Sequence, residues 1–409
     1  MHVNRSTTLR ARWVVPIAGP PIENGFLEIG DGRVLCTGKA TAETSICHDL
    51  GDTAILPGLV NAHTHLEFSD LVEPVGHAGM ELADWIVAVI KSRNARSERD
   101  RDAPQPDRDV ITTGAIEAAQ SGTALIGEIA TTPWQAPATE VTVVSYAEVL
   151  GLSASRAAER FQAATQHAQS YPHAAGISPH APYSAPPELI KQCIDFALRS
   201  SSPLAMHVAE SPAERELLQH GSGPFAENLQ SLGLDVAAHF PWRRESPMNW
   251  LIDSLAHAPA ASIVHGNDLR DDEIHRMAIH PSLSVVYCPR THAYFGHAPH
   301  PVAKLLAAGI NVGLGTDSRA SNPDLQLWRE VQFLLNERQD LPPDCVLQMA
   351  TQGGAIAMQR GALFGSLLPG RVATLATIPT QAPSEASLYR DFSSAPASLF
   401  RLMPPTTRH

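Results

Sequence analysis

The order of apolar and polar residues divides the chain into two kinds of segment. From residue 8 to residue 55 there are short β-rich stretches, TLRARWVVP and NGFLEIGDGRVLCTG, and the second is broken at Asp31-Gly32, a dipeptide suited to a tight hairpin turn. After Leu56-Pro57-Gly58, short apolar runs alternate with longer Ala-rich stretches. This alternation is typical of parallel strands joined by crossover helices.

Eight apolar runs in the second part suit the strands of a closed barrel, so the predicted fold class is α/β, a (β/α)8 or TIM barrel. The runs are LVNAHTH (59–65), TALIGEI (123–129), VTVVSYAEVLG (141–151), AAGISPH (174–180), LAMHVAE (204–210), ASIVHGN (261–267), LSVVYCP (283–289) and NVGLGTDS (311–318). Helices are expected between them, over 82–91, 110–120, 154–167, 187–198, 213–218 and 325–335, with a last one near 345–358. The charged stretch 97–109 is expected to be an exposed loop.

A strand-like segment, RVATLATI, follows the last helix, and we expect it to rejoin the N-terminal strands. The chain then consists of a barrel at 56–362 and a small β-sandwich-like domain made from 1–55 and 363–409. A length of 409 residues suits this division, because a barrel of this class takes about 250 residues.

Composition and charge restrict the classes of partner. The formal net charge of −12 disfavours nucleic acid and anionic membrane surfaces, so a small-molecule substrate is expected. The N-terminus lacks the apolar core of a signal peptide, and no stretch approaches the ~20 continuous apolar residues of a membrane span, which predicts a cytoplasmic protein. The five cysteines are scattered and form no CxxC pair, which argues against a disulfide framework and a cysteine-zinc site.

The strongest local signal for chemistry is His63-Thr64-His65, at the end of the first barrel strand. Residues two apart on a strand point to the same side, so both imidazoles can face one ion. Later candidate strands also end in a polar residue: His180, His207, His265 and Asp317. A packed core role is the commoner interpretation of any one histidine, but a series at strand ends favours an active site at the barrel mouth. Imidazole nitrogen with carboxylate oxygen suits Zn²⁺ or Fe²⁺ better than Mg²⁺ or Ca²⁺.

The segments that contain these residues closely resemble the amidohydrolase superfamily, and within it the cytosine-deaminase-like and chlorohydrolase-like enzymes. The matching segments are LPGLVNAHTHLEFS (56–69), SPHAPYS (178–184), MHVAES (206–211), IVHGNDL (263–269), YCPRT (287–291) and GLGTDSRASN (313–322). The resemblance covers nearly the whole chain, including the split β domain, and implies a metal-dependent hydrolase.

The resemblance also implies a role for each residue of the site. The metal ligands would be His63, His65, His207 and Asp317. Glu210 would be the proton shuttle, and His265 would orient the metal-bound water. The implied chemistry is attack of a metal-bound hydroxide, because a bound Zn²⁺ lowers the pKa of its water toward about 7. Asp317 would accept the water proton, and Glu210 would protonate a ring nitrogen and pass a proton to the leaving ammonia.

One divalent transition-metal ion per chain is expected, with Zn²⁺ preferred and Fe²⁺ as the alternative. The fourth strand carries Ser178 and His180, and has no lysine of the kind that two-metal relatives keep there. In this branch, His180 resembles a substrate-contacting histidine and Trp85 the aromatic residue of the same pocket. Each also has a structural alternative, because His180 could cap a helix and Trp85 could pack one.

Two departures from the family pattern suggest further substrate-binding residues. Relatives usually have CPxSN after the seventh strand, whereas this chain has CPRTH at 288–292, which makes Arg290 and His292 candidates. Glu67 stands where many deaminases have an apolar residue. In this respect the chain resembles relatives that act on aminofutalosine.

The expected reaction is hydrolytic deamination of an amino-substituted heterocycle, such as a purine nucleoside derivative, a pterin or a pyrimidine. Two alternatives keep the same metal: removal of a chloro or alkylamino group from a triazine-like ring, and hydrolysis of a cyclic amide of the imidazolone type. A non-catalytic barrel would predict damaged ligands, whereas every expected ligand residue is present. Relatives are often dimers or larger, so a homo-oligomer is compatible with the resemblance.

Overall fold

Eight parallel strands in sequential order form the centre of the protein. The computed structural model describes residues 6–99, 106–172 and 174–400. The strands are β6 (Leu59–Thr64), β7 (Thr123–Ala130), β8 (Thr142–Val149), β9 (Ala175–Pro179), β10 (Leu204–Val208), β11 (Ala261–His265), β12 (Leu283–Tyr287) and β13 (Asn311–Leu314). A parallel bridge between Thr64 and Asp317 brings the two outer strands together, so the barrel is nearly closed. All eight predicted strands are confirmed.

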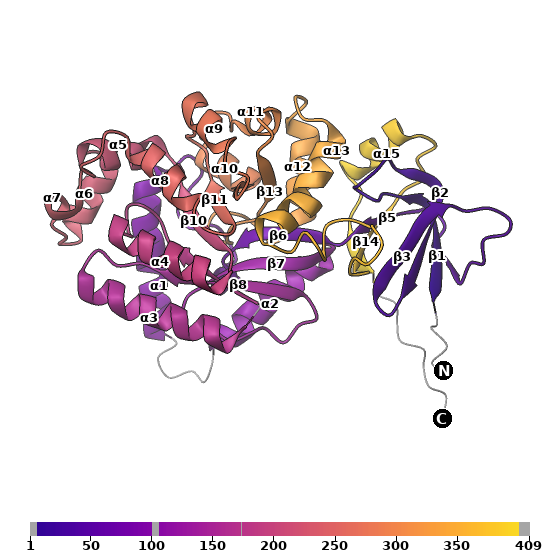
Figure 1. Ribbon diagram of the computed structural model, residues 1–409, viewed down its shortest axis with the longest axis horizontal. Coiled ribbons are helices and arrows are strands. Elements are labelled where there is room, and N and C mark those ends of the chain that lie inside the picture. The colour runs from indigo at the N-terminus through magenta and orange to yellow at the C-terminus, as the bar shows by residue number, and fades with distance from the viewer. Residues whose placement is uncertain (1–5, 100–105, 173, 401–409) are drawn as a thin grey trace.

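Helices surround these strands (Figure 1). They are α1 (Leu82–Arg99), α2 (Pro106–Gln120), α3 (Ala154–Ser170), α4 (Pro187–Ser200), α5 (Pro212–His220), α6 (Pro224–Ser231), α7 (Val236–His239), α8 (Pro247–Leu255), α9 (Asp271–Met277), α10 (Pro289–Phe295), α11 (Val302–Ala307), α12 (Leu327–Glu337), α13 (Pro343–Gln348), α14 (Gly354–Ala357) and α15 (Glu385–Phe392). Both ends of the stretch 97–109 are helical and its middle, 100–105, lies outside the described residues, so the predicted loop was too long. Charge alone is a poor loop signal, because Arg, Lys and Glu are good helix formers.

The last predicted helix, near 345–358, is interrupted. Between α13 and α14 the backbone forms a π-helical turn over Met349–Gly353. The turn packs directly against β13, where a Cβ atom on Gly353 would lie 2.0 Å from the carbonyl oxygen of Val312. Only glycine allows the two backbones to approach so closely.

A second, mixed sheet lies at one end of the molecule, to the right in Figure 1. It contains β1 (Thr7–Val14), β2 (Ile22–Gly30), β3 (Arg33–Lys39), β4 (His48–Asp49), β5 (Thr53–Pro57), β14 (Leu375–Pro379) and β15 (Ser398–Phe400). As predicted, β2 and β3 form a hairpin that turns at Asp31-Gly32, and the C-terminal strand β14 pairs with β5. The seven strands form a single sheet, which is simpler than the predicted sandwich-like arrangement.

The two sheets meet at Gly58, the one residue between β5 and β6. Its amide donates a hydrogen bond to the carbonyl oxygen of Thr374, 2.8 Å away. A Cβ atom here would lie 2.3 Å from the Cβ of Ala124, so glycine allows the small sheet to join the barrel closely. No helix among the described residues is long and apolar enough to cross a membrane.

Candidate active site

The predicted metal-binding and catalytic residues lie at the carboxyl ends of the barrel strands. Three strand ends turn sharply, because Ala209, His265 and Asp317 have positive φ angles of 55°, 71° and 56° although none is glycine. Such backbone conformations are uncommon for residues with a side chain and cluster at functional sites. Here they end β10, β11 and β13 at the mouth of the barrel.

Three histidines form a cluster that can hold a metal ion: His63, His65 and His207. The Nε2 atoms of His65 and His207 are 3.4 Å apart. Two Zn²⁺–nitrogen bonds of about 2.0–2.1 Å at a tetrahedral angle separate the nitrogens by about 3.4 Å, so this spacing fits a shared ion. Both ring nitrogens of His63 are buried and have no hydrogen-bond partner among the described residues.

The environment of the cluster also suits a metal. Burial, followed by the charge of His63, lowers the pKa of His65 and His207, so both imidazoles are neutral at neutral pH and offer a free lone pair. The Nδ1 of His207 donates to the carbonyl oxygen of His180, 2.8 Å away, which directs Nε2 toward the cluster. Such a hydrogen bond is the usual way in which a protein fixes the tautomer of a metal-binding histidine.

The carboxylate of Asp317 lies beside the three histidines. Its Oδ1 is 3.7 Å from the Nε2 of His63 and 3.8 Å from that of His65, and its Oδ2 accepts a hydrogen bond of 2.8 Å from Ser321. Burial would raise the pKa of Asp317, but the contact with His63 and the charges of the surrounding histidines hold it well below its usual value. Asp317 is therefore an ionised oxygen donor at the edge of the cluster.

Glu210 and His265 lie next to each other at the same mouth, with 3.4 Å between Oε1 and Nε2. Burial, helped by the negative charges of Asp317 and Glu214, raises the pKa of Glu210 well above its usual value. Burial lowers the pKa of His265 to about 3, so this histidine is neutral. A carboxyl group that keeps its proton beside neutral imidazoles can act as an acid.

The backbone around Glu210 is held by two side chains. Glu214, which is fully buried on α5, accepts hydrogen bonds from the amides of Ala209 (2.8 Å) and Glu210 (3.3 Å). Asn267 donates to the carbonyl oxygen of Glu210 at 3.0 Å. These three bonds fix the turn that presents the Glu210 carboxyl group.

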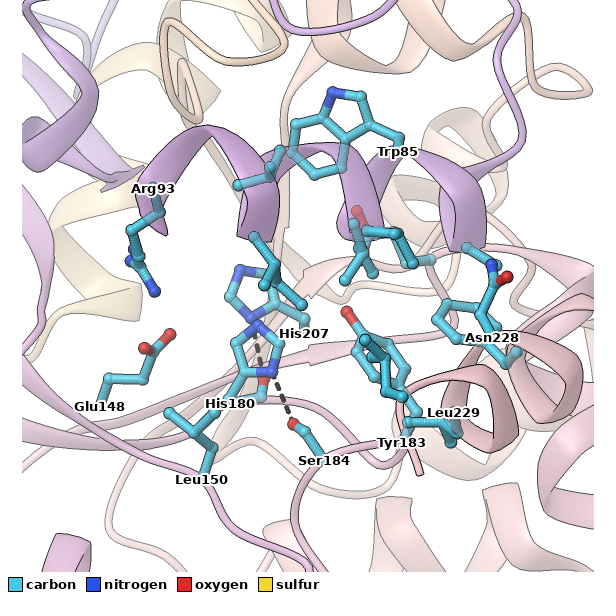
Figure 2. Close-up of a pocket in the computed structure, with 18 of the residues that line it drawn as sticks. Trp85, Arg93, Glu148, Leu150, His180, Tyr183, Ser184, His207, Asn228 and Leu229 are labelled. Carbon is cyan, nitrogen blue, oxygen red and sulfur yellow. Dashed lines mark hydrogen bonds between the residues drawn. The ribbon is translucent and has the colours of Figure 1, made fainter. Parts of the chain in front are cut away.

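A cavity of about 410 Å³ opens above the cluster, and Figure 2 shows part of its lining. Its walls are mainly apolar side chains of α1 and of the segment from α6 to residue 234. Trp85 and His180 both line it, as the resemblance implies. The Nδ1 of His180 is 2.6 Å from the hydroxyl of Ser184, and burial lowers its pKa to about 4, so His180 faces the cavity as a neutral group.

Three other predicted substrate-binding residues do not line this cavity. The guanidinium of Arg290 binds Asp324 (2.6 Å) and Glu330 (2.6 Å) in buried ion pairs. The Nε2 of His292 donates to the carbonyl oxygen of Ala298 at 2.9 Å. Glu67 pairs with Arg93, and Arg93 itself reaches the cavity wall.

Three charged residues that the sequence did not single out line the cavity: Arg93, Glu148 and Arg156. Glu148 stands near the end of β8, inside the run VTVVSYAEVLG that was recognised as a strand. A polar residue at a strand end is the signal that picked out the histidines, and it could have found Glu148. Arg93 comes from the middle of α1, where periodicity predicts only a helix.

Together, the fold and the site are those of a metal-dependent hydrolase built on a barrel. The model of the amidohydrolase family matches residues 54–400, and the chain belongs to this family.

Individual relatives extend this match over most of the chain. The 5-methylthioadenosine/S-adenosylhomocysteine deaminase of Nitratidesulfovibrio vulgaris (strain Miyazaki F) is 28% identical over 404 residues, which cover 91% of this chain and 83% of that protein. The aminodeoxyfutalosine deaminase of Deinococcus radiodurans is 29% identical over 316 residues, 73% of this chain and 72% of that protein. The crystal structure of Helicobacter pylori aminofutalosine deaminase has a TM-score of 0.80 at 19% identity, covers 97% of this chain and 98% of its own, and supports the fold.

Proposed function

We propose that this protein is a single-metal deaminase that releases ammonia from a purine nucleoside derivative. The observation that carries the proposal is the convergence of three buried histidines with Asp317 and Glu210 at the floor of a largely apolar cavity. The residue types supply metal ligands, an ionised carboxylate and a protonated carboxyl group within one mouth.

The metal would be held by the three histidines of the cluster and by Asp317. Nitrogen and oxygen donors in this number suit Zn²⁺, with Fe²⁺ as the alternative. When bound, such an ion supplies Lewis acidity and lowers the pKa of the attacking water. One ion is proposed and not two, because β9 carries Ser178 and ends in Pro179, ahead of His180, and so has no lysine to hold a second.

The chain's own residues then move the protons. Asp317 accepts the proton of the attacking water, since its low pKa keeps it ionised beforehand. Glu210 donates its proton to a ring nitrogen of the substrate, which its raised pKa permits. It then takes the proton of the hydroxyl group newly attached to the carbon and passes it to the amino group, which leaves as ammonia, and the proton held by Asp317 restores Glu210. His265, next to Glu210, stabilises the oxygen that develops negative charge at the attacked carbon.

Two observations support a nucleoside in preference to a bare heterocycle. Relatives that align with most of this chain are named for deamination of adenosine derivatives and of aminodeoxyfutalosine. The cavity extends well beyond the histidine cluster, toward Arg93 and Glu148 on one side and toward Tyr183 and Leu229 on the other (Figure 2). A single ring would leave much of this space unfilled.

Ammonia release from a defined panel tests the proposal. The panel contains adenosine, 5′-methylthioadenosine, S-adenosylhomocysteine and aminodeoxyfutalosine, with adenine, cytosine, a pterin, a chlorotriazine and an imidazolone as the alternatives. We expect ammonia together with the corresponding 6-oxo nucleoside, and about one metal ion per chain by elemental analysis. Turnover of the triazine or the imidazolone alone would reject the nucleoside assignment, and two stoichiometric metals would reject the single-metal site.

A further inference from the structure

His300 is a buried histidine that contacts the active site without belonging to it. It lies on the loop between α10 and α11 and is only 2% exposed. It does not line the catalytic cavity, and neither the metal cluster nor the proposed proton transfers use it. Its Nε2 instead donates a hydrogen bond of 2.8 Å to the carbonyl oxygen of His265. The bond joins this loop to the backbone of a residue of the proposed chemistry.

The backbone that receives this bond has an unusual conformation. His265 has a φ angle of 71° and Gly266 one of 64°, so the chain turns through two consecutive left-handed residues at the end of β11. Glycine adopts such angles readily, but holding a residue with a side chain there costs about 1–3 kcal/mol and requires a surrounding structure that fixes it. The carbonyl group of His265 turns with its backbone, so a donor that holds this carbonyl also holds the turn.

His300 is itself held firmly enough to serve as that donor. Its ring stacks on the ring of Tyr287 at the end of β12, with centroids 3.8 Å apart and 16° between the planes. Pro299 and Pro301 flank it and restrict its backbone. Arg338 donates to its carbonyl oxygen at 3.4 Å. The loop is therefore tied to β12, the strand next to β11.

Packing alone does not account for a histidine at this position. Burial lowers the pKa of His300 to about 3, so the ring is neutral and has one N–H. The carbonyl of His265 can only accept, so that hydrogen is on Nε2, and the buried Nδ1 has no partner among the described residues. A phenylalanine would stack on Tyr287 and bury no unpaired nitrogen. What the histidine adds is the hydrogen bond to His265.

We propose that His300 is a positioning residue for His265. By binding its carbonyl oxygen, His300 fixes the left-handed turn and keeps the His265 imidazole beside Glu210, with 3.4 Å between Nε2 and Oε1. The catalytic consequence rests on the proposed function, in which His265 stabilises the oxygen at the attacked carbon. A displacement of about 1 Å in such a group can reduce the rate about 10²-fold.

Two substitutions separate the hydrogen bond from the ring. His300→Phe keeps the stack on Tyr287 and removes the donor, whereas His300→Gln loses the ring and keeps an amide N–H. The assay uses the metal-loaded enzyme and the compound of the panel above that the wild type deaminates best. We expect kcat of His300→Phe to fall about 10- to 100-fold while KM changes less than roughly threefold. His300→Gln should recover most of this loss. If His300→Phe fails to fold, His300→Leu also removes the donor and takes its place.

A second background and a matched control show whether the loss acts through His265. In a His265→Ala enzyme, adding His300→Phe should reduce kcat by less than about twofold, because the group that it positions is already absent. His167→Phe is the control. His167 is also buried, packs against the ring of Trp134 and has its Nε2 2.8 Å from the hydroxyl of Ser145, but it does not line the cavity. That variant should lower the melting temperature and leave kcat unchanged.

The crystal structure of His300→Phe tests the positioning without turnover. Compared with a wild-type crystal structure, we expect the turn at His265 to relax and its imidazole to move away from Glu210. An unchanged His265, equal losses in the Phe and Gln variants, or the same loss in the His265→Ala background would overturn the proposal. If no compound of the panel releases ammonia, the proposed function fails, and the two crystal structures still decide whether His300 holds His265.

Discussion

Replacing Glu210 with glutamine separates proton transfer from metal binding. Glutamine keeps the shape of the side chain and can hydrogen bond, but it cannot carry a proton between the ring nitrogen and the ammonia. The backbone at this position is fixed by Glu214 and Asn267, so the substituted side chain keeps its place. The three histidines of the cluster are untouched, and the metal should stay bound.

The expected magnitude follows from the role. Loss of a positioned general acid costs about 10²- to 10⁴-fold in rate, so kcat of Glu210→Gln should fall by at least about 10²-fold. The pH profile adds a second signature. Because the pKa of Glu210 is raised, its proton is retained above the ordinary carboxyl range, and activity that needs this proton falls as the pH rises through the raised value. The residual activity of the Glu210→Gln variant should not show this decrease as the pH rises.

The assay combines elemental analysis with ammonia release as a function of pH. Glu216→Gln, an exposed carboxylate on the same helix as Glu214, is the matched control and should behave as wild type. Loss of the metal in Glu210→Gln would make Glu210 a ligand. A kcat near the wild-type value would remove it from the chemistry altogether.

Three further substitutions test the surroundings of the site. His63→Ala should lower the metal content well below about one ion per chain and abolish activity, because it removes a ligand; unchanged metal content would show that His63 is not one. Arg290→Ala leaves the buried carboxylate of Glu330 without a charged partner and Asp324 with only the more distant Arg329 (3.6 Å), so we expect a loss of about 3–5 kcal/mol in the free energy of unfolding and a lower melting temperature, with substrates affected alike; a selective change of substrate preference would support the specificity role predicted from sequence. Glu214→Gln offers one acceptor oxygen where two amides now donate, so kcat should fall more than KM rises and the melting temperature should drop, and a change confined to KM would argue against this positioning role.

The strand ends could be found from the sequence because two independent patterns coincide there. An apolar run shows where each strand lies, and the first polar residue after it, such as His207 or Asp317, shows where the strand reaches the barrel mouth. Parallel strands bring those ends together whatever the loops do. The eight strands and the histidine cluster followed from this rule.

Residues beyond the strand ends could not be placed in the same way. Arg290 lies three residues beyond β12, in the first turn of α10, and its spacing from the strand is compatible with a position at the cavity or among the outer helices. The choice depends on Asp324 and Glu330, which lie more than 30 positions later and approach only in the folded chain. A buried arginine needs charged partners, and here two carboxylates outside the cavity supply them.

Arg93 and Glu148 show where the strand-end rule stops being sufficient. Glu148 obeys the rule, but a carboxylate beside a strand end means little until its partner is known. That partner lies on α1, 55 positions earlier, and periodicity along a helix marks only which face is apolar. Arg93 and Glu148 become informative only when both are seen to line one cavity. Catalytic residues in this barrel can therefore be predicted from the sequence of single strands. The residues that line the substrate cavity come from pairs of elements that only the fold brings together.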